Sequence, residues 1–169
     1  MSSVKISNLG IVANKVRNIL PGTAYNICFP KALGNNILVS KSATVFDTLN
    51  VIERVVKATL DDTKKISQIL KADTLEKTLK NIHNFFYKHY KYKLDEPGIE
   101  QVRRPSRAWL DRATGIDCDC FSTSISSVLT NLGIPHYLKI VAINGRDYYQ
   151  HVYVVVPKNS NSNMNNKND

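Results

Sequence analysis

A change in the spacing of apolar residues over the last third of the chain constrains the fold most. After Cys118, apolar side chains recur every three or four residues, as on one face of a helix. From residue 137, two Val- and Tyr-rich runs, 137–143 and 148–156, flank Asn144-Gly145, a dipeptide typical of a tight hairpin turn. We therefore expect a helix that begins at Cys118 and packs on an antiparallel hairpin. Its apolar positions are Phe121, Ile125, Val128, Leu129 and Leu132.

The position of Cys118 suggests a reactive thiol. The first turn of a helix has unpaired N–H groups and the positive end of the helix dipole, which favour a thiolate over a thiol. We therefore expect the pKa of Cys118 to be lowered. His151, on the second strand of the hairpin, is the candidate base or imidazolium partner. Spacing alone leaves an alternative open, in which Cys118 is an inert core thiol and His151 is a hydrogen-bonded strand residue.

Four segments between residues 73 and 157 together resemble the transglutaminase-like (papain-like cysteine protease) superfamily, in its small bacterial and phage members. The resemblance implies that Cys118, rather than Cys120, is the nucleophile and that His151 is its base. It implies an α+β fold with a papain-like core, in which the nucleophile helix packs on a small antiparallel sheet. The segments are the aromatic helix 83–90 with 92–95, the stretch 100–108, the box 115–121 with the helix end 132–135, and the strand 151–154.

The box departs from the family pattern in two places. Ile116 separates Gly115 from Asp117, and Cys120 stands where the family has a second acidic residue. Neither change removes the thiol of Cys118.

A third departure concerns the acid that orients the histidine in the family, an Asp on the following strand. Here the chain continues after Pro157 into an Asn- and Ser-rich segment without a strand pattern. Asp169 ends that segment, and Asp147 is predicted to lie near the hairpin turn, away from His151. We therefore expect no clear third member of a catalytic triad.

The resemblance implies a cysteine-dependent acyl-transfer enzyme, foremost a peptide or isopeptide hydrolase, that acts on a protein or peptide and needs no cofactor. A phage association makes peptidoglycan stem peptides and virion proteins candidate substrates. The alternative is a catalytically degenerate domain that serves as a structural or binding component of a phage particle, with a basic surface for DNA or protein partners. The missing acid, the additional N-terminal region and the basic charge favour the alternative, whereas the retained Cys118 and His151 favour the enzyme.

Three regions are expected along the chain. Residues 1–72 form a partly helical N-terminal extension, 73–157 form the transglutaminase-like domain, and 158–169 form an Asn- and Ser-rich tail predicted to be disordered. Apolar spacing predicts a helix that begins at Ser42 or Thr44, runs to about residue 60, and continues after Asp61-Asp62 through 66–70. Further helices are expected at 75–90, after a cap at Asp73-Thr74, and from Pro105 onward.

The formal net charge of +9 predicts attraction to polyanions such as DNA or an anionic cell-wall polymer. Tyrosine and lysine interleave over residues 87–93, which would suit base stacking but is more often the end of an amphipathic helix.

Three cysteines are too few for a disulfide framework, and a Cys-x-Cys pair with no second pair makes a poor zinc site, so no metal is expected. No apolar run approaches the roughly 20 residues of a membrane span, and the first residues lack the pattern of a signal peptide. These features predict a cytoplasmic or virion-associated protein.

Overall fold

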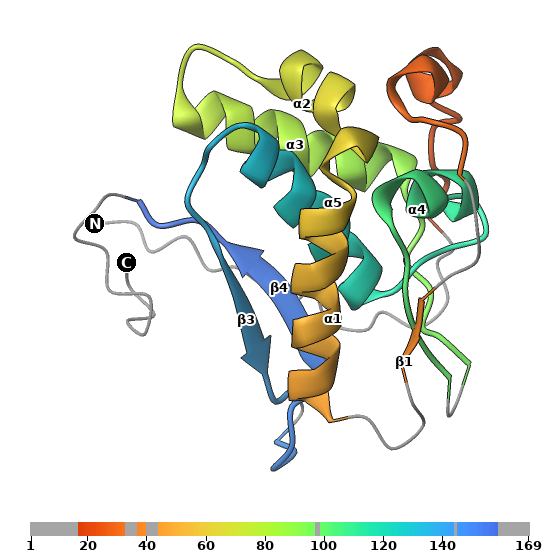
Figure 1. The fold of residues 1–169 in the computed structure, drawn as a ribbon, viewed down its shortest axis with the longest axis vertical. Coiled ribbons are helices and arrows are strands. Elements are labelled where there is room, and N and C mark those ends of the chain that lie inside the picture. The colour runs from red at the N-terminus through yellow and green to blue at the C-terminus, as the bar shows by residue number, and fades with distance from the viewer. Residues whose placement is uncertain (1–16, 33–36, 40–43, 97–98, 144, 159–169) are drawn as a thin grey trace.

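The computed structural model, shown in Figure 1, describes residues 17–32, 37–39, 44–96, 99–143 and 145–158. Within these residues the protein mixes helices with short antiparallel strands, so the expected α+β class is confirmed. None of the described helices is long and apolar enough to cross a membrane. In chain order the elements are η1 (Thr23–Cys28), β1 (Ile37–Val39), α1 (Val45–Ala58), η2 (Leu60–Asp62), α2 (Lys64–Leu70), α3 (Leu75–His89), β2 (Glu100–Val102), α4 (Pro105–Asp111), α5 (Cys118–Asn131), β3 (Tyr137–Val141) and β4 (His151–Val155).

Helix α5 lies at the centre of the molecule, where α1, α2, α4 and β4 all pack against it (Figure 1). Most of its inward side chains are small, which lets the neighbouring elements approach closely. Several hydroxyls find partners within this packing: Ser127 pairs with Thr63 at 2.7 Å, and Ser122 donates to the Val152 carbonyl at 3.2 Å. The buried small residues of α5 are Cys120, Ser122, Thr123, Ser124, Ser126 and Ser127.

The expected hairpin is confirmed. Strands β3 and β4 pair antiparallel, from Tyr137 opposite Val155 to Val141 opposite His151. Along β4, Val152 is buried and Tyr153 is exposed, as the alternation of a strand requires. A second pair, β1 with β2, sets Ile37 opposite Val102.

Two apolar clusters join the N-terminal helices to the rest of the fold. Ile66 and Leu70 of α2 lie in a cluster with the aromatic side chains of α3 and with Trp109. Trp109 is 4% exposed and stacks on Phe29, with ring centroids 4.6 Å apart. Helix α1 forms the other cluster with Val102 and Val152. Residues 45–70 and the segment from 73 to 157 therefore share their cores.

The helix boundaries follow from local capping. Thr44 and Asp47 form a capping box at the start of α1, with the Asp47 N–H donating to the Thr44 hydroxyl at 3.3 Å. Thr74 caps α3 by accepting from the Lys77 N–H at 3.2 Å. The helices expected near 44–60, 66–70 and 75–90 and after Pro105 are all confirmed. The predicted disorder of 158–169 falls, beyond residue 158, outside the described residues.

One buried ion pair ties η2 to α4. The Arg104 guanidinium donates to both carboxylate oxygens of Asp62, at 2.6 and 2.8 Å, and the Ser106 N–H adds a third bond at 2.9 Å. Burial opposes ionisation of Asp62, but the bonds from Arg104 and Ser106 outweigh it and hold its pKa below the usual value. Because the Asp62 side chain is only 1% exposed, its charge depends on these partners.

We expect Arg104→Met to lower the free energy of unfolding by about 3–5 kcal/mol, because it leaves the buried Asp62 carboxylate without its counter-charge. The control is Lys57→Met, which breaks the exposed pair with Glu53 and should cost less than about 1 kcal/mol. Chemical denaturation of the three proteins gives the comparison, and equal losses in the two variants would show that the Asp62 pair has no special weight.

Candidate active site

Gly115 and Asp117 determine how α5 begins. Gly115 has a φ of 117°, and a Cβ there would lie 2.5 Å from the Lys93 side chain, so only glycine permits this approach. The close approach lets residues 91–93 bond to Ile116 in a short parallel bridge. The Asp117 side chain then accepts from the Cys120 N–H at 3.2 Å as the N-cap. Cys118 is consequently the first residue of α5, as the sequence predicted.

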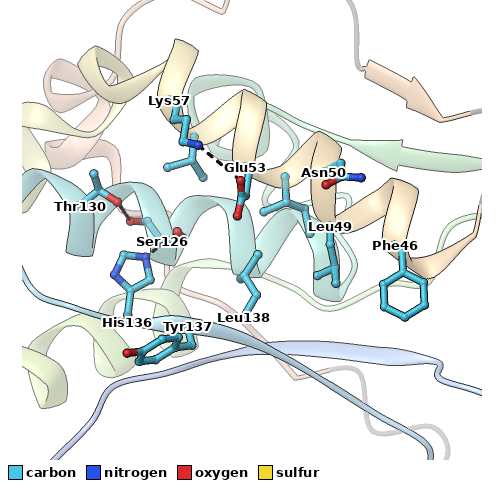
Figure 2. Close-up of a pocket in the computed structure, with 12 residues that line it drawn as sticks. Phe46, Leu49, Asn50, Glu53, Lys57, Ser126, Thr130, His136, Tyr137 and Leu138 are labelled. Atoms are coloured by element: carbon cyan, nitrogen blue, oxygen red, sulfur yellow. Dashed lines mark hydrogen bonds and ion pairs between the residues drawn. The ribbon is translucent and has the colours of Figure 1, made fainter. Parts of the chain in front are cut away.

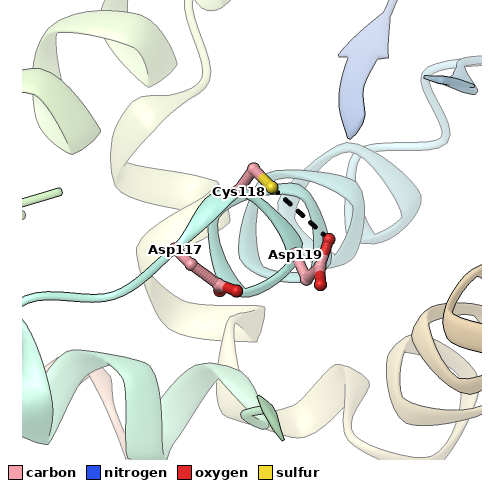
Figure 3. A group of neighbouring side chains, drawn as sticks. All are labelled: Asp117, Cys118 and Asp119. Atoms are coloured by element: carbon pink, nitrogen blue, oxygen red, sulfur yellow. Dashed lines mark hydrogen bonds between the residues drawn. The ribbon is translucent and has the colours of Figure 1, made fainter. Parts of the chain in front are cut away.

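The half-buried thiol of Cys118 lies among three polar groups. It donates to Asp119 Oδ1 at 3.6 Å (Figure 3). The Val152 N–H of β4 and the Tyr92 hydroxyl also lie within hydrogen-bonding reach of the sulfur. Cys118 additionally packs against the apolar cluster of α1, Val102 and Val152.

His151 is the first residue of β4 and is half-buried. Its ring stacks on Tyr153, with ring centroids 6.0 Å apart and an interplanar angle of 29°. Among the described residues, no hydrogen bond joins the imidazole of His151 to the thiol of Cys118. The fold therefore brings the sulfur to the backbone of β4 at Val152, one residue from His151, without bonding the two side chains. Burial lowers the pKa of His151, which favours the neutral ring.

Carboxyl groups surround the start of α5. Asp119 is 6% exposed; burial raises its pKa to about 9, helped by a hydrogen bond with Glu100 and by the nearby Asp117. Asp119 therefore keeps its proton at neutral pH. Burial and the neighbouring Asp95 raise the pKa of Asp117 to about 6, against the N–H bond from Cys120.

These surroundings overturn the expected thiolate. Burial, followed by the effect of Asp119, raises the pKa of Cys118 to about 12, although the Val152 N–H favours the charged form. The prediction of a lowered pKa was wrong because it counted only the helix terminus, whereas desolvation and adjacent carboxyls act more strongly on this sulfur.

The Cys118 sulfur and one carboxylate oxygen each of Asp117 and Asp119 lie within 4.8 Å of one another (Figure 3). Such spacing would admit a cation, but each of these groups already has a partner within the fold. Asp117 caps α5, and Asp119 bonds with Glu100.

The sequence also singled out a second cysteine and two aspartates in relation to the candidate site. Cys120 is fully buried, and its sulfur accepts from the Arg103 N–H and Nη1 at 3.4 and 3.3 Å. Asp147 is exposed in the β3–β4 connection, near the turn as expected, and Asp169 lies outside the described residues. The sequence reasoning missed Tyr92 and Glu100 at the site, although both lie in segments that carried the family resemblance.

Comparison of the chain with models of known protein families, with curated proteins and with solved structures finds no match.

We expect Asp119→Asn to stabilise the protein increasingly as the pH rises from 4 to 8. The folded protein holds a proton on Asp119 up to a pKa of about 9, whereas an ordinary aspartate releases it near 3.8, so stability is lost as pH rises between these values. An asparagine does not titrate and can still donate to Glu100. The melting temperature should rise by about 5 °C at pH 8 and hardly change at pH 4.

The control for that experiment is Asp61→Asn, which removes a carboxylate from an exposed position of η2. A pH-independent difference between Asp119→Asn and the unsubstituted protein would rule out a retained proton at Asp119.

Proposed function

We propose that the protein is a cysteine-dependent acyl-transfer enzyme of transglutaminase-like type, a peptide or isopeptide hydrolase with Cys118 as nucleophile and His151 as base. One observation carries the proposal. The thiol at the first residue of the central helix lies against the backbone of β4 at the point where His151 begins that strand. This is the relation between helix and strand that a Cys-His pair requires.

In the proposed reaction, Cys118 sulfur attacks the amide carbonyl carbon while His151 takes the thiol proton. The tetrahedral oxyanion collapses, the C–N bond breaks, and the amine leaves with the proton from His151. Water then attacks the thioester, with His151 again as base, and the carboxylate product and free thiol are released. N–H groups in the first turn of α5 and the Tyr92 hydroxyl are donors available to the oxyanion.

The raised pKa of Cys118 and the lowered pKa of His151 decide which form of this mechanism applies. Both groups rest in their neutral forms, so the proton moves during attack rather than in a preformed thiolate–imidazolium pair. The His151 ring must also leave Tyr153 and turn toward the sulfur. Substrate binding is the event proposed to drive that change of rotamer.

The first test uses p-nitrophenyl acetate, which reports acyl transfer by release of nitrophenolate. We expect slow turnover with an acetyl group on Cys118, located by peptide mass spectrometry. Cys118→Ala should abolish turnover, and His151→Ala should reduce it by about 100-fold or more, the usual contribution of a general base.

Cys28→Ser is the matched control, since Cys28 is a buried free thiol that belongs to a different apolar cluster from the one against which Cys118 packs. Full turnover in Cys118→Ala, or acetylation confined to other residues, would remove Cys118 from the mechanism. Turnover unchanged in His151→Ala would remove the proposed base.

A second candidate function is a catalytically degenerate domain that binds DNA or protein within a phage particle. The raised pKa of Cys118 favours it, as does the lack, among the described residues, of a carboxylate bonded to His151. The basic surface at the end of α3 supplies a binding face: Lys88 is exposed, and the Arg17 guanidinium lies 3.9 Å from the ring centroid of the exposed Tyr87.

For that candidate we expect binding to duplex DNA that weakens steeply with salt, because phosphate neutralisation releases counterions. Lys88→Ala should weaken binding and flatten the salt dependence, whereas Lys57→Ala on α1 should change neither. Filter binding or fluorescence anisotropy over a salt series measures this, and salt-insensitive binding would argue against a charge-driven partner.

A further inference from the structure

We propose that the groove between α1 and β3 binds an extended polypeptide and receives a large apolar side chain three or four residues from the bond attacked by Cys118. The inference rests on the proposed function, whose substrate class it specifies. It also gives α1, which lies outside the family's core, a direct part in recognition.

The groove has a volume of about 610 Å³ and is built by three elements (Figure 2). Helix α1 forms one wall, from Phe46 to Lys57, and the residues that begin β3 form the other. Ser126 and Thr130 of α5 lie at its floor. Phe46 and Lys57 are eleven positions apart on the helix, which makes the wall roughly 16 Å long. A segment of about five extended residues has that length.

The floor carries a fixed polar anchor. His136 Nδ1 lies 2.8 Å from the Ile134 carbonyl oxygen, and His136 Nε2 lies 2.7 Å from the Ser126 hydroxyl (Figure 2). Since a carbonyl can only accept, Nδ1 carries the proton and, in the neutral ring, Nε2 accepts from Ser126. The Ser126 oxygen then keeps acceptor capacity for an N–H of a bound peptide.

The walls of the groove favour an apolar side chain of a bound peptide. Phe46 is 60% exposed and Tyr137 is 54% exposed, although both are large and apolar. The charged residues of the groove, Glu53 and Lys57, pair with each other at 3.4 Å. Because their charges offset one another, the groove favours an aromatic or aliphatic side chain over an acidic or basic one.

The groove borders the apolar cluster against which the candidate nucleophile packs. Leu49 and Leu138, which line it, pack in the same apolar cluster as Cys118. Ser126 follows Cys118 by eight residues on α5, about 12 Å along the helix axis. At about 3.3 Å per extended residue, this distance corresponds to three or four residues of bound peptide.

Strand β3 offers the backbone contacts that hold an extended chain. Within the described part of the protein, β3 pairs only with β4, so its other edge is open for main-chain hydrogen bonds. Side chains of a peptide added at that edge would alternate, with every second one turned toward the groove floor.

The test uses peptides that carry a chloroacetyl group, whose alkylation of Cys118 depends on proximity and does not require turnover. The sulfur displaces chloride from the chloroacetyl carbon, and mass spectrometry gives the rate. Two series of peptides are made, one for each chain direction. In each series, zero to six glycines separate the chloroacetyl group from a single Phe. We expect one series to react fastest with the spacing of three or four residues, at least ~10-fold faster than its Ala counterpart.

Phe46→Ala and Tyr137→Ser change exposed side chains of the groove, and each should reduce the ratio of the alkylation rates of the Phe and Ala peptides by about 5-fold or more. Ile69→Ala is the matched control, because Ile69 is 54% exposed on α2 and does not line the groove. Thermal unfolding of each variant checks that the fold is retained.

Alkylation of Cys118 that is independent of spacing and of Phe, or a preference untouched by the groove variants, would overturn the groove proposal. A spacing optimum without acyl turnover in the nitrophenyl ester test would instead overturn the enzymatic function and leave a peptide-binding groove.

Discussion

The burial of most of α5 between four other elements is the constraint on which the rest of the structure depends. A helix surrounded by α1, α2, α4 and β4 must present small side chains, and its buried hydroxyls must find partners. Ser127 pairs with Thr63, and Ser122 pairs with the backbone of β4. These bonds set the positions of the neighbouring elements relative to α5. The same burial reaches the first turn of the helix, where Cys118 lies.

At that first turn, the helix terminus lowers the pKa of the Cys118 thiol and desolvation raises it. The relative magnitudes of the two effects decide the result. A helix dipole contributes about 0.3–1 kcal/mol at exposed sites and up to ~2 kcal/mol in partly buried ones, at most about 1.5 pKa units. Burial and Asp119 together take the pKa of Cys118 from 9.0 to about 12, a larger change in the opposite direction. Under the proposed function, such a thiol would need a base that acts during the attack, so the rotamer of His151 would matter more than the helix dipole.

The parts of the fold that depend on local sequence could be predicted, and those that depend on tertiary contact could not. Apolar spacing and the Thr74 cap were sufficient for α3, and the Asn144-Gly145 dipeptide was sufficient for the pairing of β3 with β4. No local pattern places Glu100 beside Asp119, because β2 reaches α5 only in the folded chain. The bond between Ser126 and His136 was missed for a similar reason: it joins the middle of a helix to the residue before a strand.

Helix α1 could be predicted from local sequence and also takes part in the tertiary contacts around the site. Its apolar face closes the cluster that contains Val102 and Val152, and Cys118 packs against the same cluster. In the described structure, the Val152 N–H is the one backbone donor that acts on the Cys118 sulfur. Because α1 packs against Val152, it supports the strand that carries this N–H. Part of the same face of α1, at Ile52 and Val56, also borders the groove together with Phe46 and Asn50. Since α1 both buries the support of the Cys118 thiol and lines the neighbouring groove, a substitution on its apolar face would alter the site and the groove together.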